Sequence, residues 1–94
     1  MNIYRYGFSA ICPNNGERIY YRLVVTTDFM VPVEVIKSAC GCHPSAYHEQ
    51  IADALAVELG GEQVITAVHH GVEIETRRGW QRRVPATIAA LPPP

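Results

Sequence analysis

Residues 3–27 read IYRYGFSAICPNNGERIYYRLVVTT. Apolar and aromatic residues alternate with polar ones on both sides of Pro13-Asn14-Asn15-Gly16. An Asn-Gly pair between two alternating segments predicts a β-hairpin, because a two-residue type I′ turn needs positive φ at both central residues. With Asn15-Gly16 at the tip, Cys12 pairs with Ile19, and every pair on that face is apolar or aromatic. A four-residue turn over residues 13–16 would shift the pairs by two positions and keep the same faces, so we expect one face to be buried.

The residues after the hairpin predict a short helix. Pro32 can take the first helical position, where its missing N–H group is not needed. Val33, Ile36 and Cys40 then share one side of the helix, and Gly41 can end it. Valines alternate at positions 31, 33 and 35, which leaves a loop open as the alternative.

A second, longer helix is predicted by a four-residue repeat of apolar side chains. Ser45 is a good N-cap for this helix, and Gly60-Gly61 follows the end of the repeat. The outer face is polar, and alanines beside the repeat would let the helix approach a sheet closely. The repeat consists of Tyr47, Ile51, Leu55 and Leu59.

From Glu62 onward the sequence again shows the two-residue period of a β-strand. Residues 64–68 are apolar on both faces, which indicates an interior strand, whereas residues 72–76 alternate like a half-exposed strand. We expect His70-Gly71 to form the tip of a second tight hairpin, with a bulge in one long strand as the alternative.

The order of the predicted elements is β-β-α-α-β-β. It predicts a single α+β domain over residues 1–80, in which one antiparallel four-stranded sheet carries two helices on one face. Residues 81–94 are expected to form a C-terminal tail, because they lack a period and end in Leu91-Pro92-Pro93-Pro94.

This order of elements, over residues 3–78, resembles the tunnelling fold of pterin- and purine-handling enzymes. The resemblance implies assembly into a β-barrel oligomer. It also implies a metal-binding set of histidines or a reactive cysteine, together with a glutamate that anchors the substrate. The resemblance is one of topology, and it assigns none of these roles to a particular residue of this chain.

Charge and cysteine content narrow the class of protein. Eight of the nine acids lie between Asp28 and Glu75, where Lys37 is the only base, and the rest carries seven arginines and Glu17. Three cysteines are an odd number, which argues against a disulfide framework and favours a reducing compartment. No apolar run approaches the roughly 20 residues of a membrane helix, and the N-terminus shows no signal pattern. We therefore expect a cytoplasmic protein with no membrane partner.

Two groups of cysteines and histidines are candidates for metal binding. Thiolate and imidazole ligands suit Zn²⁺, but the first group departs from the Cys-x₂-Cys spacing of structural zinc sites. Neighbouring side chains on a strand point to opposite faces, which weakens the second group. The sequence therefore assigns no metal and no cofactor. The groups are Cys40, Cys42, His43 and His48, and His69 and His70.

The residues for nucleophilic or acid–base catalysis form no known motif. A reactive thiolate needs a cation, a helix N-terminus or a histidine beside it. Cys12 faces inward in the predicted hairpin, so we interpret it as a packed thiol. Glu49 and Asp53 lie four residues apart on the polar face of the second helix, where carboxylates are usually solvated rather than paired for acid–base work.

Two charged groups are expected to contact a partner. Arginine and tryptophan often dominate protein interfaces, and they also bind phosphates and stack on bases. Four arginines form too small a patch for tight non-specific DNA binding, so a protein partner is favoured over nucleic acid. The acidic helix face could instead compete with nucleic acid for a basic groove. The groups are Arg77, Arg78, Trp80, Arg82 and Arg83, and Glu49, Asp53 and Glu58.

These features favour a non-enzymatic interaction module. One such class is the small inhibitor encoded by phages and mobile elements, including anti-CRISPR proteins, which blocks a partner surface. One alternative is a small oligomeric, metal-dependent enzyme or ligand-binding protein of tunnelling-fold type. The other is a weak nucleic-acid binder acting through its arginine-rich C-terminal segment. The second face of the predicted sheet mixes aromatic, arginine and apolar side chains, which predicts self-association, for example as a homodimer.

Overall fold

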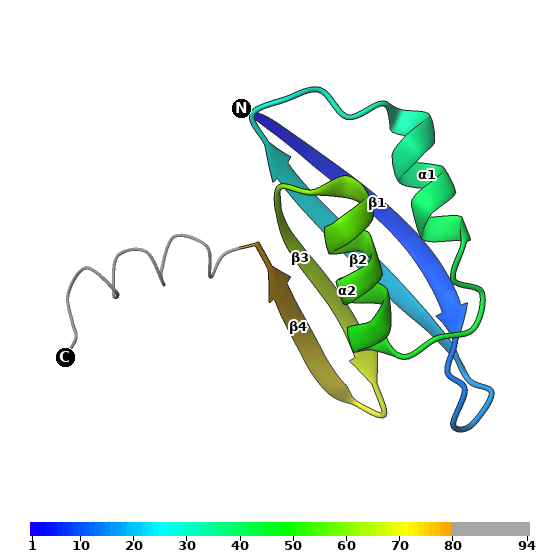
Figure 1. The fold of residues 1–94 in the computed structure, drawn as a ribbon. Helices are drawn as coiled ribbons and strands as arrows, with labels where there is room; N and C mark the ends of the chain where they lie inside the picture. The colour runs from blue at the N-terminus through cyan, green and yellow to red at the C-terminus, as the bar shows by residue number, and fades with distance from the viewer. Residues whose placement is uncertain (80–94) are drawn as a thin grey trace, which may run out of the picture.

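A computed structural model of the chain describes residues 1–79. They form one antiparallel sheet of four strands in the order β1-β2-β3-β4, with both helices on one face (Figure 1). The predicted class and element order are therefore confirmed, whereas the predicted tail, residues 81–94, lies outside the described residues. The elements are β1 (Asn2–Ile11), β2 (Arg18–Thr27), α1 (Val33–Gly41), α2 (His48–Leu59), β3 (Glu62–His69) and β4 (Val72–Arg78).

The β1–β2 hairpin closes through a four-residue turn. Ala10 lies opposite Ile19, the Cys12 N–H donates to the Glu17 carbonyl at 2.7 Å, and the Gly16 N–H donates to the Cys12 carbonyl at 2.8 Å. The register with a two-residue tip is therefore wrong by two positions, because Cys12 and Glu17 close the ladder before the turn. The faces are unchanged by this shift. The predicted buried face is accordingly the one that the helices cover.

Helix α1 exists where it was predicted, but it begins one residue later. Pro32 is its N-cap, with ψ of 137°, rather than its first helical residue. Ile36, Ala39 and Cys40 are buried against the sheet, whereas Val33 is exposed. The inward side of α1 therefore consists of its middle and last turns.

Helix α2 begins three residues after the predicted N-cap. Tyr47 is the N-cap, and its N–H group donates to Gln50 Oε1 at 3.1 Å. Ser45 is instead drawn to the end of β1, where it forms a parallel bridge with Ile11. The predicted repeat is buried from Ile51 onward, whereas the Tyr47 side chain is largely exposed.

The connection from α2 to β3 combines two glycines with one buried polar side chain. Gly60 and Gly61 have φ of 69° and 72°, a region that favours glycine. The Gln63 Nε2 group donates to the carbonyls of Leu55 at 2.9 Å and Gly60 at 2.8 Å. Gln63 therefore satisfies carbonyls at the end of α2, which a helix cannot pair internally.

The second hairpin has the tight tip that was predicted. His70 and Gly71 have φ of 52° and 80°, as a two-residue type I′ turn requires at both positions. The interior position of β3 and the edge position of β4 also agree with the sequence pattern. Figure 1 shows both hairpin tips at the same end of the sheet.

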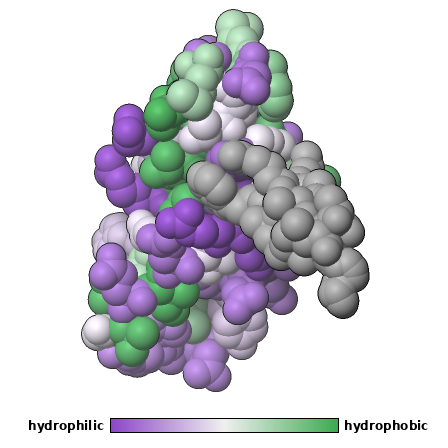
Figure 2. Space-filling model, turned by 90° about the vertical axis from the view of Figure 1, so that its left-hand side faces the viewer, coloured by the Kyte–Doolittle hydropathy of each residue, from purple (hydrophilic) through white to green (hydrophobic). Residues whose placement is uncertain are grey.

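The core lies between the helices and one face of the sheet. Leu23, Ile65, Ile51 and Leu55 are its largest aliphatic side chains and are at most 1% exposed. The opposite sheet face is uncovered within the described part of the chain, and Tyr20 is 72% exposed there. On the side of the molecule shown in Figure 2, hydrophobic and hydrophilic residues are interspersed. Among the described residues, no helix is both long and apolar enough to cross a membrane.

Candidate functional site

Several titratable side chains gather at the hairpin end of the sheet. The tips of the two hairpins lie side by side there, although they are far apart in sequence. Asn15 Nδ2 is 2.9 Å from His70 Nε2, and His70 Nε2 is 3.6 Å from Glu17 Oε1. The ligand atoms of Glu17, His69 and His70 all lie within 4.8 Å of one another.

A small cavity of about 30 Å³ lies under the start of α2, next to these tips. Such a volume is sufficient for an ordered water molecule. The chain leading into α2 is fixed there, because the Ile11 N–H donates to the Pro44 carbonyl at 2.8 Å and the Ala46 N–H donates to the Ile11 carbonyl at 3.2 Å. The cavity is lined by Cys12, Ile19, Tyr21, Ala46, Tyr47, His48, His69 and Ile74.

His48 is the titratable group most affected by this environment. Its ring packs edge-on against Tyr21, with ring centroids 5.3 Å apart. Neither ring nitrogen has a hydrogen bond of ordinary geometry to another described residue. Burial lowers the pKa of His48; the Ile65 backbone and Glu49 oppose this shift, and Arg78 adds to it. The ring is therefore neutral near pH 7, the form in which it can accept a proton.

Two buried thiols of the chain have different surroundings. Cys12 lies in the cavity, where burial and, to a lesser extent, Cys12 itself raise the pKa of Tyr21. Cys40 lies on the buried side of α1, and burial and the Glu58 carboxylate raise its pKa to about 11. All three cysteines are free, and Cys42 is exposed. Only Cys12 among them lines a cavity together with histidines.

The first group of candidate metal ligands does not come together. Within residues 1–79, the only potential ligand group of three is the one formed by Glu17, His69 and His70. Cys40 is buried in the core, as its helix position indicated, and Cys42 is exposed. Instead, the structure brings His48 beside His69 around one cavity.

Within the described residues, one arginine of the basic group pairs with two carboxylates of the acidic group. Arg78 Nε donates to Asp53 Oδ1 at 2.7 Å, and Arg78 Nη2 lies 3.6 Å from Glu49 Oε1. Arg77 pairs with Glu75 at 2.7 Å. Trp80, Arg82 and Arg83 lie outside the described residues. The basic strand end and the acidic helix face are thus neighbours on one surface.

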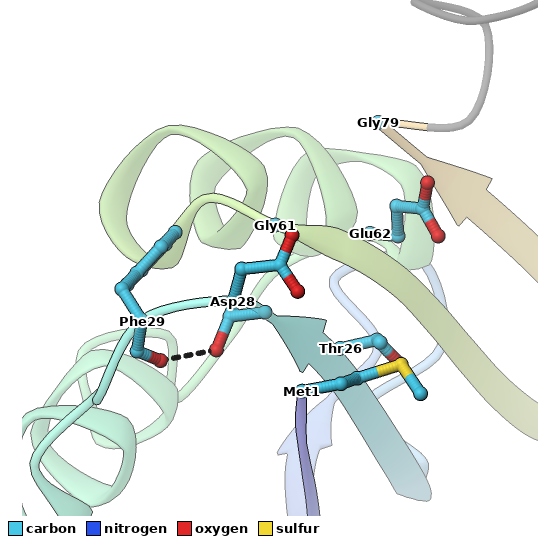
Figure 3. Close-up of a pocket in the computed structure, with 8 residues that line it drawn as sticks. Met1, Thr26, Asp28, Phe29, Gly61, Glu62 and Gly79 are labelled. Carbon is cyan, nitrogen blue, oxygen red and sulfur yellow. Dashed lines mark hydrogen bonds between the residues drawn. The ribbon is translucent and has the colours of Figure 1, made fainter.

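A second hollow, of about 550 Å³, lies at the opposite end of the sheet. Figure 3 shows Asp28 and Glu62 on its wall, with Met1 and Phe29 on either side. The dashed line there is the hydrogen bond from the Thr27 hydroxyl to the Phe29 carbonyl. The hollow carries carboxylates but no thiol or histidine among its described lining residues.

Comparison with known proteins relates the chain to a fold. No model of a known protein family matches it, and no curated protein matches it. The crystal structure of a QueF-like archaeosine synthase in its apo form is similar, with a TM-score of 0.67 over 82% of this chain and 89% of that one. Sequence identity is 15%, so the likeness shows a shared fold. The chain is thus a small α+β protein that shares the fold of that synthase.

Sequence reasoning missed Glu17 and Tyr21 as site residues. Glu17 was grouped with the basic part of the chain, although its place directly after the turn puts its side chain beside the second tip. Tyr21 was assigned to the buried face, which is correct, but its contact with His48 depends on where α2 starts. The alternation pattern predicted its face and contained no signal for that contact.

Proposed function

We propose that the chain is a small oligomeric enzyme or ligand-binding protein of tunnelling-fold type, and that it acts at the cavity of Cys12, His48 and His69. One observation carries this proposal: the thiol directly after β1 and two histidines from α2 and β3 line one cavity at the start of a helix. The fold shared with an archaeosine synthase supports the enzyme class over the interaction module.

The chemistry of the cavity suits covalent catalysis by a thiol. Cys12 is the nucleophile, and neutral His48 accepts the thiol proton as sulfur attacks an electrophilic carbon of the ligand. A sulfur–carbon bond forms as the π bond between that carbon and its heteroatom opens, and the proton taken by the imidazole passes to the heteroatom. The start of α2 lines the same cavity as Cys12, and the N-terminal end of a helix favours negative charge near it.

The size of the cavity limits what can bind in the single chain. Small-molecule sites span roughly 300–1,000 Å³, whereas this cavity measures about 30 Å³. A planar purine or pterin, the ligand class of the tunnelling fold, therefore needs a second wall. Tyr47, which is 47% exposed at the rim, could move aside, or a second copy could supply the wall.

The sheet offers edges for such a second copy. β1 and β4 are the edge strands of the described sheet, and unpaired edges are templates for strand addition. Assembly through them would build the oligomer that the topology implies. Analytical ultracentrifugation tests this part: a strict monomer at high micromolar concentration contradicts it.

Alkylation rates test the role of Cys12 with an internal control. Cys12 and Cys40 are 3% and 2% exposed, so the reagent reaches them equally poorly, whereas the raised pKa of Cys40 slows its reaction. In a Cys42→Ser background, iodoacetamide followed by mass spectrometry should modify Cys12 at least about tenfold faster at pH 7, because reactivity follows thiolate character. His48→Ala should slow the modification of Cys12, and His43→Ala should leave it unchanged. Equal rates at Cys12 and Cys40 contradict the proposal.

Ligand binding is tested with a panel of planar heterocycles. Guanine, hypoxanthine and neopterin should each be examined for a shift in the unfolding temperature, since a ligand that binds only the folded chain stabilises it. A shift with one of them that is lost in His48→Ala supports the site. The absence of a shift with all of them contradicts the purine or pterin class and leaves the alkylation result to decide the thiol chemistry.

As a second candidate we infer an interaction module of the inhibitor kind. The observation that favours it is a run of exposed apolar side chains at and before the start of α1, of which Met30 is 75% exposed. Charge reversal at Glu49, Asp53 and Glu58 would abolish binding if the acidic helix face is the contact, and Met30→Ser would do so if the apolar run is. Partner binding that survives both changes contradicts this candidate. The apolar run is Phe29, Met30, Val33 and Val35.

A further inference from the structure

We propose that Glu17, His69 and His70 form a zinc site between the two hairpin tips, with a fourth position open to water or a ligand. Two imidazoles and one carboxylate are a ligand set that suits Zn²⁺. The proposal does not depend on the chemistry at Cys12. Glu17 and His70 have no role in the proposed catalytic step, whereas His69 also lines the Cys12 cavity.

The distances fit a tetrahedral ion. Zinc–ligand bonds of about 2.0–2.2 Å at tetrahedral angles place two ligand atoms about 3.3–3.6 Å apart. His70 Nε2 and Glu17 Oε1 are 3.6 Å apart, and the whole set lies within 4.8 Å. Side-chain rotations are therefore sufficient to bring all three atoms onto one ion.

The backbone under each ligand is already fixed. Glu17 is held by the bond from the Cys12 N–H to its carbonyl, 2.7 Å long, and its own N–H donates to Asn15 Oδ1 at 3.0 Å. His70 is held in the tight turn with φ of 52°. The His69 and His70 rings stack with centroids 4.6 Å apart, so both rings face the same side of the tip.

The hydrogen bonds around His70 bring two acceptors together. Because the Glu17 N–H donates to Asn15 Oδ1, the amide is oriented with its NH₂ group toward His70 Nε2, 2.9 Å away. An amide NH₂ can only donate, so Nε2 must carry a lone pair. Two acceptors, Nε2 and the Glu17 carboxylate, therefore face each other at 3.6 Å.

The Asn15 amide occupies the place of the ion. Its Nδ2 also lies 3.5 Å from Glu17 Oε1, so one neutral donor bridges the two acceptors where a cation would sit. His69 Nε2 is buried without a hydrogen-bond partner among the described residues, and such a nitrogen is costly unless an ion or water satisfies it. Zinc would displace the amide and use both acceptors.

Isothermal titration of tag-free, chelator-treated full-length protein with zinc chloride tests the site. We expect one zinc per chain. Glu17→Gln and His70→Ala should each raise Kd at least about tenfold, since even residues behind the ligands cost 10–100-fold. Asn15→Asp keeps the acceptor for the Glu17 N–H, replaces the competing amide by a carboxylate oxygen, and should lower Kd.

Matched controls are Glu34→Gln and His43→Ala, which change the same residue types away from the tips and should leave Kd unchanged. Absence of binding at tenfold excess zinc overturns the proposal. Binding that is insensitive to Glu17→Gln and His70→Ala, or that is lost only in Cys12→Ser, overturns it as well. Glu17→Gln leaves the Cys12 cavity intact. The alkylation rate of Cys12 in this variant therefore separates failure of the zinc site from failure of the proposed function.

Discussion

Gly61, in the turn between α2 and β3, is one of two described glycines, together with Gly79, at which an added Cβ would collide with backbone atoms. A Cβ added at Gly61 would lie 2.6 Å from the Thr26 carbonyl oxygen and 2.7 Å from Thr27 Cγ2, with φ at 72°. Gly71 has a comparable φ of 80°, but a Cβ there would meet nothing within 4 Å. The two glycines thus share backbone strain and differ in the space around them.

This difference sets the expected magnitudes for alanine at each position. A left-handed backbone costs an L-residue roughly 1–2 kcal/mol, and this is the full cost for Gly71→Ala. Gly61→Ala adds an overpacking cost of about 1–3 kcal/mol, since the oxygen it meets belongs to the backbone of β2. Gly61→Ala should therefore lower the free energy of unfolding by about 2–5 kcal/mol.

Circular dichroism follows both variants and the unchanged chain. Urea unfolding gives the free energy of unfolding, and thermal unfolding gives the melting temperature. At about 4–8 °C per kcal/mol for a domain of this size, their melting temperatures should differ on the order of 10 °C. If Gly71→Ala destabilises as much as Gly61→Ala, the reasoning from space is refuted, because conformation alone would then account for both. If neither variant is destabilised, the left-handed turns themselves are wrong.

Other changes probe the core, the helix end and the cavity. Leu23→Ala should cost about 2–5 kcal/mol in urea unfolding, because it empties a fully buried site, and a loss under 1 kcal/mol would mean that the helices do not cover β2. Gln63→Leu removes the donor to the Leu55 and Gly60 carbonyls and should cost about 1–3 kcal/mol; an unchanged stability would show that water replaces it. His48 has a pKa lowered by burial, so the unfolded chain binds its proton more readily. Stability should therefore fall as pH drops below about 6.5, the ordinary histidine value, and His48→Gln should flatten this part of the profile between pH 7 and 5; an equal slope in both proteins contradicts the burial.

Alternation along the strands was sufficient to predict the sheet, but not its details. Polar and apolar residues were sorted so consistently in residues 3–27 that the faces survived an error of two positions in the register. The sequence left the turn length open between a two-residue tip at Asn15-Gly16 and a four-residue turn over residues 13–16, and only the Cys12–Glu17 pair decides between the two. Ser45 failed as an N-cap for a similar reason, since its bridge to Ile11 is a tertiary contact.

The site was harder to predict because it forms between elements. Cys12 was interpreted as a packed thiol, and it is buried as expected. Its neighbours His48 and His69 come from other elements, and no local pattern reports that they meet. His69 and His70 were expected to point apart on a continuous strand or to be solvent-exposed in a turn; the turn forms, with His70 in a left-handed conformation, and the two rings stack.

The β2–β3 pairing has a consequence for how the chain reaches its native state. The two hairpins are local and can form within microseconds, whereas Thr26 meets Glu62 only after the intervening helices have closed a long loop. The β2–β3 pairing contributes most of the contact order and should limit the folding rate. Since closure entropy grows only with the logarithm of loop length, insertions between α1 and α2 should slow folding little.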